Sequence, residues 1–490
     1  MPTEDKLSEL QGRVAELKRK KQSSDKFVKT GKKRNVDHQS ALSSVAGSER
    51  FHGLDFLRAM AMLMGLVFHA PMLYYIPVMA DGFKDFGVSS ATMPPMEAWL
   101  SAIVYWLHSW RMTVFFMISG FFTALVLSKR TTAQFITDRF IKLALTTLLF
   151  ASLFDLMDGR FDGKLEHIWF LYYLFIFSCI TGCFAALKPP SKNTEKSHHS
   201  TKAIMILLII AAILVAVRPA LDQLDGGHVG VASHYHTIKF GGFLYFFAWF
   251  CSGMWLYSNR VLLVSANSML LTTCSLIAAA GVFYILLPDL SGIWGYGATP
   301  AETEAEAFRI SLLKGLNAVL WAVFFTLATH QVMKKSNKLL DWLVTLSFPI
   351  YIFHLTPCIV LSAVLIGMGL SQFQVVVGVV FGAFAISVFL YYLLIKFTPL
   401  SWIILGYKNS WLQPFKKKVW PWMRIFKARL KTLELKNPTP CTAEQEKAFR
   451  DIISYLDSLA KRKACGDNQV QTEIEAVNKF LRAQWSSNQD

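Results

Sequence analysis

The sequence predicts an all-α polytopic membrane protein, with about ten transmembrane helices and a small cytoplasmic helical tail. Of the 490 residues, 53% are hydrophobic and 14% are aromatic, and the mean hydropathy is +0.37. That composition is too apolar for a single soluble domain, and apolar runs close to the roughly 20 residues that cross a bilayer recur along the chain. A third observation, the alternation of basic and acidic loops, is typical of membrane topology.

Ten apolar runs are candidates for transmembrane helices. They cover residues 54–78, 98–127, 138–157, 167–187, 202–218, 239–257, 262–287, 307–330, 341–366 and 372–396. Alternate loops between them are basic, as at Lys129 and Lys334, while the others are acidic or mixed, as at Asp81 and Asp222. Because basic loops stay in the cytoplasm, this pattern predicts an even number of spans with both termini in the cytoplasm. The net charge of +17 follows from this topology, and we expect no nucleic-acid partner.

The chain divides into four predicted segments. They are a basic, largely disordered cytoplasmic arm (1–50), the ten-span membrane domain (51–400), a basic aromatic interfacial segment (401–440) and a cytoplasmic amphipathic helical hairpin (441–490). A capping-box pair, Thr442 and Gln445, and apolar residues at helical spacing on both sides of Gly466 indicate the hairpin. We expect this hairpin to dock a partner protein or to self-associate, and the basic residues of the arm to lie near anionic membrane lipid.

The first span carries three ionisable residues, Asp55, Arg58 and His69. Such groups cost about 3 kcal/mol or more at membrane depth, so their default interpretation is functional. Arg58 and His69 are eleven residues apart, which is about three helical turns or ~16 Å, and Asp55 falls on the same side. Histidine is the usual general base near neutral pH. Two simpler alternatives are an Arg58 that reaches up to lipid headgroups and a His69 that is only structural.

Other polar residues lie near the predicted outer ends of spans. His108 and Arg111 are three residues apart and therefore share one helix face. Glu166, His167 and Trp169 combine a carboxylate, an imidazole and an indole, a set that can bind polyols. Ordinary interfacial anchoring explains Trp169 equally well.

The ninth span holds a second intramembrane histidine, His354, on the same face as Tyr351. Together with His69 it indicates a polar cavity inside the helix bundle. At the cytoplasmic end of the third span, Arg139 and Lys142 could hold a phosphorylated ligand. The positive-inside rule alone could also produce these two cations. Cysteine and histidine spacing gives no metal site, so none is expected.

Four motifs resemble the integral-membrane acyltransferase family 3, and within it the branch that acts on periplasmic glucans. They are Leu54-Asp55-Phe56-Leu57-Arg58 continuing to His69, His108-Ser109-Trp110-Arg111-Met112 continuing to Ser119-Gly120, His167-Ile168-Trp169, and Tyr351-Ile352-Phe353-His354. The resemblance covers residues 50–400. It implies a ten-span core in the bacterial inner membrane that takes an acyl group from cytoplasmic acyl-CoA and delivers it to a glycan hydroxyl on the far side.

On this resemblance, His69 matches the family's catalytic histidine and Arg58 its basic partner. Arg139 falls where the family places a cytoplasmic Arg pair, but the second cation here is Lys142, which lacks the bidentate fork for CoA phosphate. Acyl-CoA is then a donor co-substrate rather than a bound cofactor. The resemblance implies a succinyl group by its glucan branch and an acetyl group by the family's common usage.

These observations give one main hypothesis and two alternatives, of which a membrane scaffold acting through its tail hairpin leaves the buried histidines unexplained. In the main hypothesis His69 accepts the glycan hydroxyl proton and Arg58 or nearby donors steady the thioester oxygen or the CoA arm. His108, Arg111, Glu166 and His167 then line the outer acceptor mouth. The other alternative is a transporter of a glycan, lipid or anionic solute, since intramembrane His and Arg also mark relays in carriers. Against it, the sequence shows no obvious pair of broken helices in corresponding halves.

Overall fold

The computed structural model describes residues 51–159, 162–187, 200–226, 228–265, 268–290, 303–335 and 337–406. Within these residues all named elements are helical, as predicted. The predicted arm (1–50), most of the interfacial segment (401–440) and the hairpin (441–490) lie outside the described residues. The elements are, in chain order, α3 (His52–His69), α4 (Met72–Tyr75), η1 (Pro77–Phe86), α5 (Ala98–Leu127), α6 (Thr132–Arg139), η2 (Phe140–Ala144), α7 (Leu145–Asp158), η3 (Glu166–Ile168), α8 (Trp169–Leu187), α9 (Ser200–Ala216), α10 (Arg218–Leu224), α11 (Phe240–Ser258), α12 (Val261–Ser265), α13 (Met269–Leu290), α14 (Glu304–Val332), α15 (Lys338–Phe353), α16 (Leu355–Gly367), α17 (Gln372–Leu390), η4 (Tyr391–Lys396) and η5 (Trp402–Gly406).

The number of membrane spans is only partly settled by the helices. Among the described residues, six helices are long and apolar enough to cross a membrane, or seven if the bent pair α15 and α16 is one span. The other predicted runs coincide with shorter or interrupted helices, such as α6, η2 and α7 in place of a single third span. The all-helical membrane fold is confirmed, and the count of about ten stays a prediction.

Two predicted spans are broken at prolines. The first ends as a helix at His69, because Pro71 has no amide to bond the carbonyl of Val67. The ninth bends by 68° between α15 and α16. Pro357, in the first turn of α16, has no amide to continue the ladder from Phe353. His354 is therefore at the bend.

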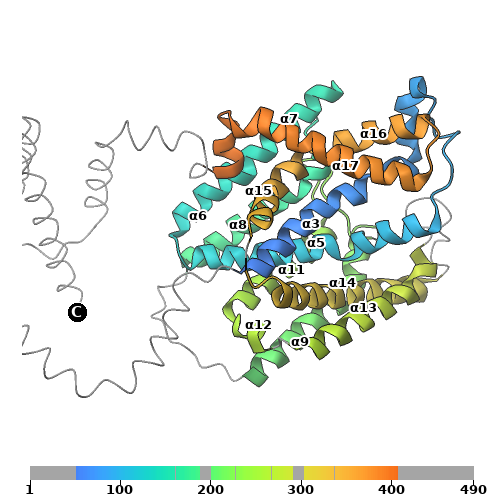
Figure 1. Cartoon of the computed structure of the whole chain (residues 1–490). Helices are drawn as coiled ribbons and strands as arrows, with labels where there is room; N and C mark the ends of the chain where they lie inside the picture. The colour runs from blue at the N-terminus through green and yellow to red at the C-terminus, as the bar shows by residue number, and fades with distance from the viewer. Residues whose placement is uncertain are drawn as a thin grey trace, which may run out of the picture. The chain divides into compact units, whose positions relative to one another are not determined.

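Helix α3 runs through the middle of the bundle (Figure 1), where it contacts α5, α14 and α15. Close approach depends on glycines. At Gly53, an added Cβ would lie only 2.6 Å from the carbonyl oxygen of Thr329 on α14. Gly120 and Gly253 likewise let α5 and α11 meet backbone to backbone. This contact brings long helices together without large side chains between them.

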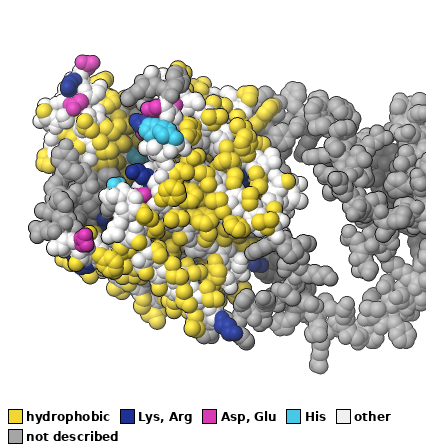
Figure 2. All heavy atoms as spheres, turned by 180° about the vertical axis from the view of Figure 1, so that it is seen from behind, with side chains coloured by type: hydrophobic (Ala, Val, Ile, Leu, Met, Phe, Trp, Pro, Cys, Tyr) yellow, Lys and Arg dark blue, Asp and Glu magenta, His cyan; other side chains and the backbone are white. Residues whose placement is uncertain are grey.

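The outer helices present apolar faces. Leu208 on α9 is 64% exposed and Ile277 on α13 is 67% exposed, and Figure 2 shows a broad apolar surface with charged side chains toward its edges. Exposed apolar area of this extent suits lipid rather than water. The chain is an integral membrane protein.

Candidate active site

Three histidines meet at the helix breaks. His69 is the last residue of α3, His354 follows α15, and His167 lies in η3 just before α8. The ring centroid of His354 is 5.2 Å from that of His69 and 5.2 Å from that of His167. The predicted neighbourhood of His69 and His354 is thus present. His167, which the sequence analysis placed at an outer mouth, is instead buried against His354, because the bend lets the start of α8 pack there.

The end of α15 sets the orientation of two of these rings. Helix ends leave backbone carbonyls without intrahelical partners. His354 donates from Nδ1 to the carbonyl of Tyr351 at 2.7 Å. His167 Nε2 lies 3.1 Å from the Tyr351 carbonyl and 3.0 Å from that of Ile352. Since carbonyls only accept, the neutral rings carry lone pairs at His354 Nε2 and His167 Nδ1. Both atoms are buried and have no hydrogen-bond partner among the described residues.

His69 is only partly enclosed. Its Nδ1 atom is buried without a hydrogen-bond partner among the described residues, whereas the residue as a whole is partly exposed. The other edge of the ring therefore reaches open space. α3 ends at His69, and His354 stands between the end of α15 and the start of α16. Both rings therefore lie where the helical backbone is interrupted and carbonyls lose their intrahelical partners.

The C-terminal end of α3 is itself held by two hydroxyl groups. Tyr75 donates to the carbonyl of Phe68 at 3.1 Å, and Ser362 donates to that of Ala70 at 2.6 Å. These bonds satisfy carbonyls that the break at Pro71 releases. They fix the position of His69 relative to α16.

Arg111 is a buried cation at this centre. It is 4% exposed, its Cζ atom lies 4.8 Å from the ring centroid of Phe68, and Nε and Nη1 have no hydrogen-bond partner among the described residues. The groups that act on it electrostatically are the hydroxyls of Tyr75 and Tyr351. An uncompensated buried charge costs several kcal/mol, roughly, so this guanidinium is suited to an anion supplied by a ligand.

Gly65 explains how Arg111 and His354 come together. A Cβ at this position would lie 2.8 Å from Arg111 Nη1 and 3.2 Å from His354 Nε2. The two nitrogens therefore flank the bare backbone of α3, within about 6 Å of each other. Arg111 was predicted at an outer mouth, and no role was predicted for Gly65. Gly65 stands four residues before His69 and so shares its helix face, which is the pattern in the sequence that points to a role for this glycine.

The N-terminal end of α3 holds a different set of charges. Arg58 pairs with Asp55 at 3.3 Å, and its Cζ atom lies 4.9 Å from the ring centroid of Phe122. Arg58 also acts electrostatically on Arg139, a buried cation stacked on Phe135. Arg58 and Arg139 therefore form a cationic group at this end.

Lys142 has a different partner from the one expected. The sequence analysis paired it with Arg139, but Lys142 binds Asp138 at 3.0 Å. The chain changes from α6 to the π-helical turn η2 between Arg139 and Lys142. The cations that act electrostatically on Arg139 are Arg58 and Arg130.

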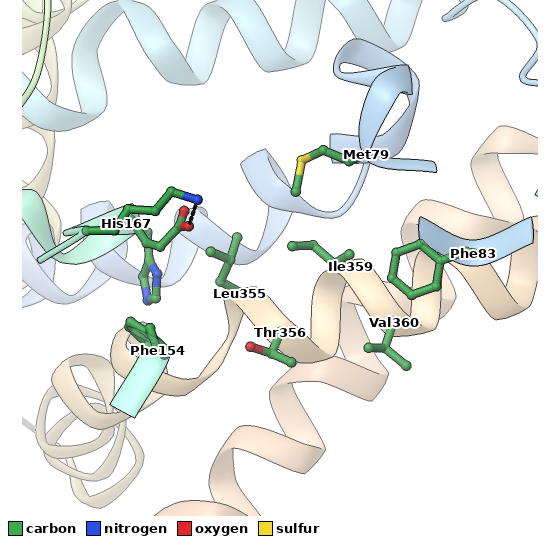
Figure 3. A pocket seen from close by; sticks show the side chains of 10 residues that line it. Met79, Phe83, Phe154, His167, Leu355, Thr356, Ile359 and Val360 are labelled. Carbon is green, nitrogen blue, oxygen red and sulfur yellow. Dashed lines mark ion pairs between the residues drawn. The ribbon is translucent and has the colours of Figure 1, made fainter. Parts of the chain in front are cut away.

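A pocket of about 280 Å³ opens beside His167 (Figure 3). Lys164 and Glu166 form an ion pair at its polar end. The remaining lining is mostly apolar: Met79, Phe83, Phe154, Leu355, Thr356, Ile359 and Val360. Glu166 borders this pocket, whereas the ring of Trp169 packs against Phe116 and Phe246. A sugar-stacking role for Trp169 stays a prediction.

His108 lies on the other side of Phe68 from the helix break. Its ring stacks on Phe68 at 5.7 Å, and it is exposed although it lies within the membrane helix α5. Arg218 and Lys314 act on it electrostatically. His108 is therefore an imidazole on α5 with several cations near it, Arg111 among them. Within the described parts of the chain, no group of three His, Cys, Asp or Glu side chains is arranged to hold a metal.

The part of the chain that matches known proteins covers most of the described helices. Residues 51–392 match the family model described as Acyltransferase domain, Acyl_transf_3. Among curated relatives, Glucans biosynthesis protein C of Escherichia coli K12 is 25% identical over 191 residues, which are 34% of this chain and 46% of that protein. The same protein of a second Escherichia coli strain is 26% identical over 191 residues, with the same shares of both chains. The chain therefore spans about half the length of the curated relatives it matches, and no solved structure matches it. Because the family model covers well over half of the sequence, this protein belongs to acyltransferase family 3.

Proposed function

We propose that this protein transfers an acyl group from cytoplasmic acyl-CoA to a hydroxyl of an extracytoplasmic glycan, with His69 as the general base. The observation that carries the proposal is the polar centre at the end of α3. There, His69 and His354 lie 5.2 Å apart, and the buried Arg111 has nitrogens without hydrogen-bond partners among the described residues. A site of this kind suits a reaction that creates a transient anion.

The donor approaches from the N-terminal end of α3. Arg58 and Arg139 lie there, and guanidinium groups bind phosphates in bidentate fashion. The ~16 Å along α3 from Arg58 to His69 is the length that the extended thioester arm of CoA has to cover. Lys142, already bound to Asp138, contributes positive charge nearby rather than a phosphate contact.

The proposed step needs one base and one oxyanion site. The glycan hydroxyl oxygen bonds to the thioester carbon while its proton passes to His69. Arg111 stabilises the negative charge on the carbonyl oxygen in the tetrahedral intermediate. The C–S bond then breaks, and His69 returns the proton to the thiolate, giving an ester and free CoA. His354, through its Nε2 lone pair, accepts a hydrogen bond from a neighbouring hydroxyl of the glycan and so orients the acceptor.

The acceptor arrives from the opposite side. His108, with Arg218 and Lys314 near it, borders a space that a glycan can occupy. The relatives of this chain are named for glucan biosynthesis, which supports a glucan as acceptor. The transferred group is succinyl or acetyl.

The proposed topology places the protein in the bacterial inner membrane with both termini in the cytoplasm. The charge alternation of the loops supports this orientation. The 51–400 segment is then the catalytic domain, and the 441–490 hairpin serves as a docking module.

The test is a covalent-product assay. Purified protein in nanodiscs is incubated with succinyl-CoA or acetyl-CoA and a glucan oligosaccharide, and mass spectrometry follows the mass gain of the glycan. We expect His69→Gln to reduce the rate by about 100-fold or more, while the matched control His52→Gln, on the same helix, stays near the wild-type rate.

Two results contradict the proposal. A folded His69→Gln protein with the wild-type rate removes the general base. Uptake of a glycan or anion into vesicles, with no covalent product under any condition, favours the transporter alternative.

A further inference from the structure

The pocket beside His167 lies along the first turns of α16, directly after the 68° bend between α15 and α16. Thr356, Ile359 and Val360 lie at positions i, i+3 and i+4 of α16 and so share one face of it. Met79 and Phe83 of η1 lie across the pocket from them (Figure 3). This wall is apolar and does not suit a free sugar.

The other end of the pocket is polar and is held in an unusual backbone conformation. His167 lines this end, with Nδ1 buried and without a hydrogen-bond partner among the described residues. Glu166, bound to Lys164, has φ 43°. A non-glycine residue in the left-handed region costs about 1 kcal/mol, and such strain persists where the surrounding structure fixes it. The pocket therefore has an apolar body and a polar head.

The pocket is open on its apolar side. Thr356 and Val360 at its rim are exposed, Val360 by 42%, and both belong to a helix of a broken membrane span. The medium around such a span is lipid. A hydrocarbon chain can therefore enter from the bilayer, whereas a polar glycan cannot.

We propose that this pocket holds the hydrocarbon chain of an amphipathic acceptor, so that the glycan is acylated while it is attached to a lipid. The inference rests on the proposed function and specifies its acceptor. The ring centroid of His354 lies 5.2 Å from those of both His167 and His69, so the His167 ring at the polar head of the pocket is at most about 10 Å from that of the base. A sugar bound beside His167, next to the ion pair of Lys164 and Glu166, can extend a hydroxyl toward His69.

The test uses methyl, hexyl and decyl glucosides as acceptors, with the protein in nanodiscs and each glucoside below its micelle concentration. Ile359→Trp fills the pocket. The matched control is Phe381→Trp, on α17 at a lipid-facing position that is 71% exposed. Partition of the glucosides into the bilayer is the same for all three proteins, so a difference between them reports the pocket.

We expect Ile359→Trp to lower the ratio of kcat/KM for decyl over methyl glucoside by about tenfold, with the methyl glucoside rate within twofold of wild type. Ile359→Met, which conserves volume, and Phe381→Trp keep the wild-type ratio. If Ile359→Trp does not fold, a second measurement uses Ile359→Met. This variant is labelled with an alkyl glucoside that carries a photoreactive diazirine on its hydrocarbon chain, and we expect the labelled residues to lie on α16.

The inference is overturned if Ile359→Trp leaves the decyl-to-methyl ratio unchanged, or if the photoprobe labels no residue of α16. It is also overturned if Ile359→Trp alters the preference among acyl-CoA chain lengths instead, since the pocket then belongs to the donor. Failure of the proposed function looks different, because then no acceptor, free glucan included, gains mass.

Discussion

The two ends of helix α3 hold charged and ionisable side chains in opposite ways. At the N-terminal end, Arg58 has a carboxylate at 3.3 Å and an aromatic ring at 4.9 Å, and it is 34% exposed. At the C-terminal end, His69 and the neighbouring Arg111 have buried nitrogens with no hydrogen-bond partner among the described residues. The charge of Arg58 is compensated within the protein, whereas His69 and Arg111 are arranged for something that binds.

This difference assigns separate energetic roles to the two ends. A compensated, partly exposed ion pair contributes about 0–1 kcal/mol to stability. Uncompensated buried polar groups each cost about 1–3 kcal/mol, and more for a charge. A protein keeps such groups where a ligand or transition state satisfies them. Mutations at the two ends should therefore separate stability from activity.

The largest expected effect is at Arg111. We expect Arg111→Met to lower kcat by about 100-fold or more and to leave the melting temperature unchanged or raised, because it removes an uncompensated buried charge. Arg58→Met should mainly raise KM for acyl-CoA, by about tenfold, with little change in kcat. Steady-state kinetics with varied acyl-CoA and thermal melting in nanodiscs give both values. The proposed contrast between the two ends of α3 is contradicted if Arg111→Met melts several degrees below the wild type while its kcat is unchanged.

A substitution at Gly65 should also lower activity without lowering stability, with a smaller effect than Arg111→Met. In Gly65→Ala the added methyl group meets Arg111 Nη1 and His354 Nε2, so both side chains have to shift. A displacement of about 1 Å in a catalytic group can cost up to about 100-fold in rate, and we expect a 10- to 100-fold loss, roughly, in kcat. Helix propensity offsets part of the steric cost, by about 1 kcal/mol, so stability should change little.

The matched control for that substitution is Gly281→Ala on α13, where an added Cβ meets no atom within 4 Å. It should keep full activity and gain up to about 1 kcal/mol in stability. Equal activity of the two variants contradicts the assigned role of Gly65.

Sequence reasoning succeeded where periodicity decides the outcome. The Arg58–Asp55 pair follows from i, i+3 spacing. A polar cavity inside the bundle was predicted from two intramembrane histidines, and the ring centroids of His69 and His354 lie 5.2 Å apart. The position of Arg111 depends on how α5 crosses α3 at Gly65. That of His167 depends on the bend at His354. Crossing points and bends are tertiary properties, and hydropathy does not encode them.

The strain at Glu166 gives a third prediction, which concerns the pocket. Glu166→Gly and Glu166→Ala both remove the ion pair with Lys164, but only glycine adopts the left-handed backbone without cost. We expect the glycine variant to be more stable by about 1 kcal/mol, measured by denaturant unfolding in the same detergent. Equal unfolding free energies for the two variants contradict a left-handed Glu166.

The smallest effect concerns the segment that carries the pocket residues Met79 and Phe83. Asp81 accepts hydrogen bonds from the backbone amide and the hydroxyl of Ser90, both at 2.9 Å. These bonds lower the pKa of Asp81 below its ordinary value of 3.8. Because the folded pKa is lower, the contribution is complete above about pH 3.8 and is lost as the pH falls through the folded pKa.

Hydrogen exchange of the Ser90 amide, corrected for its intrinsic pH dependence, should therefore stay slow down to about pH 3.8 and accelerate below the folded pKa of Asp81. In Asp81→Asn the corrected exchange rate of the Ser90 amide should no longer change with pH. In Asp85→Asn, in the same segment, this rate should follow the wild-type pH profile. If this exchange does not respond to Asp81→Asn, the carboxylate does not hold the segment. The wall of the pocket formed by Met79 and Phe83 is then fixed by apolar packing against α16 alone, and the pocket should bind alkyl glucosides equally well on either side of that pH.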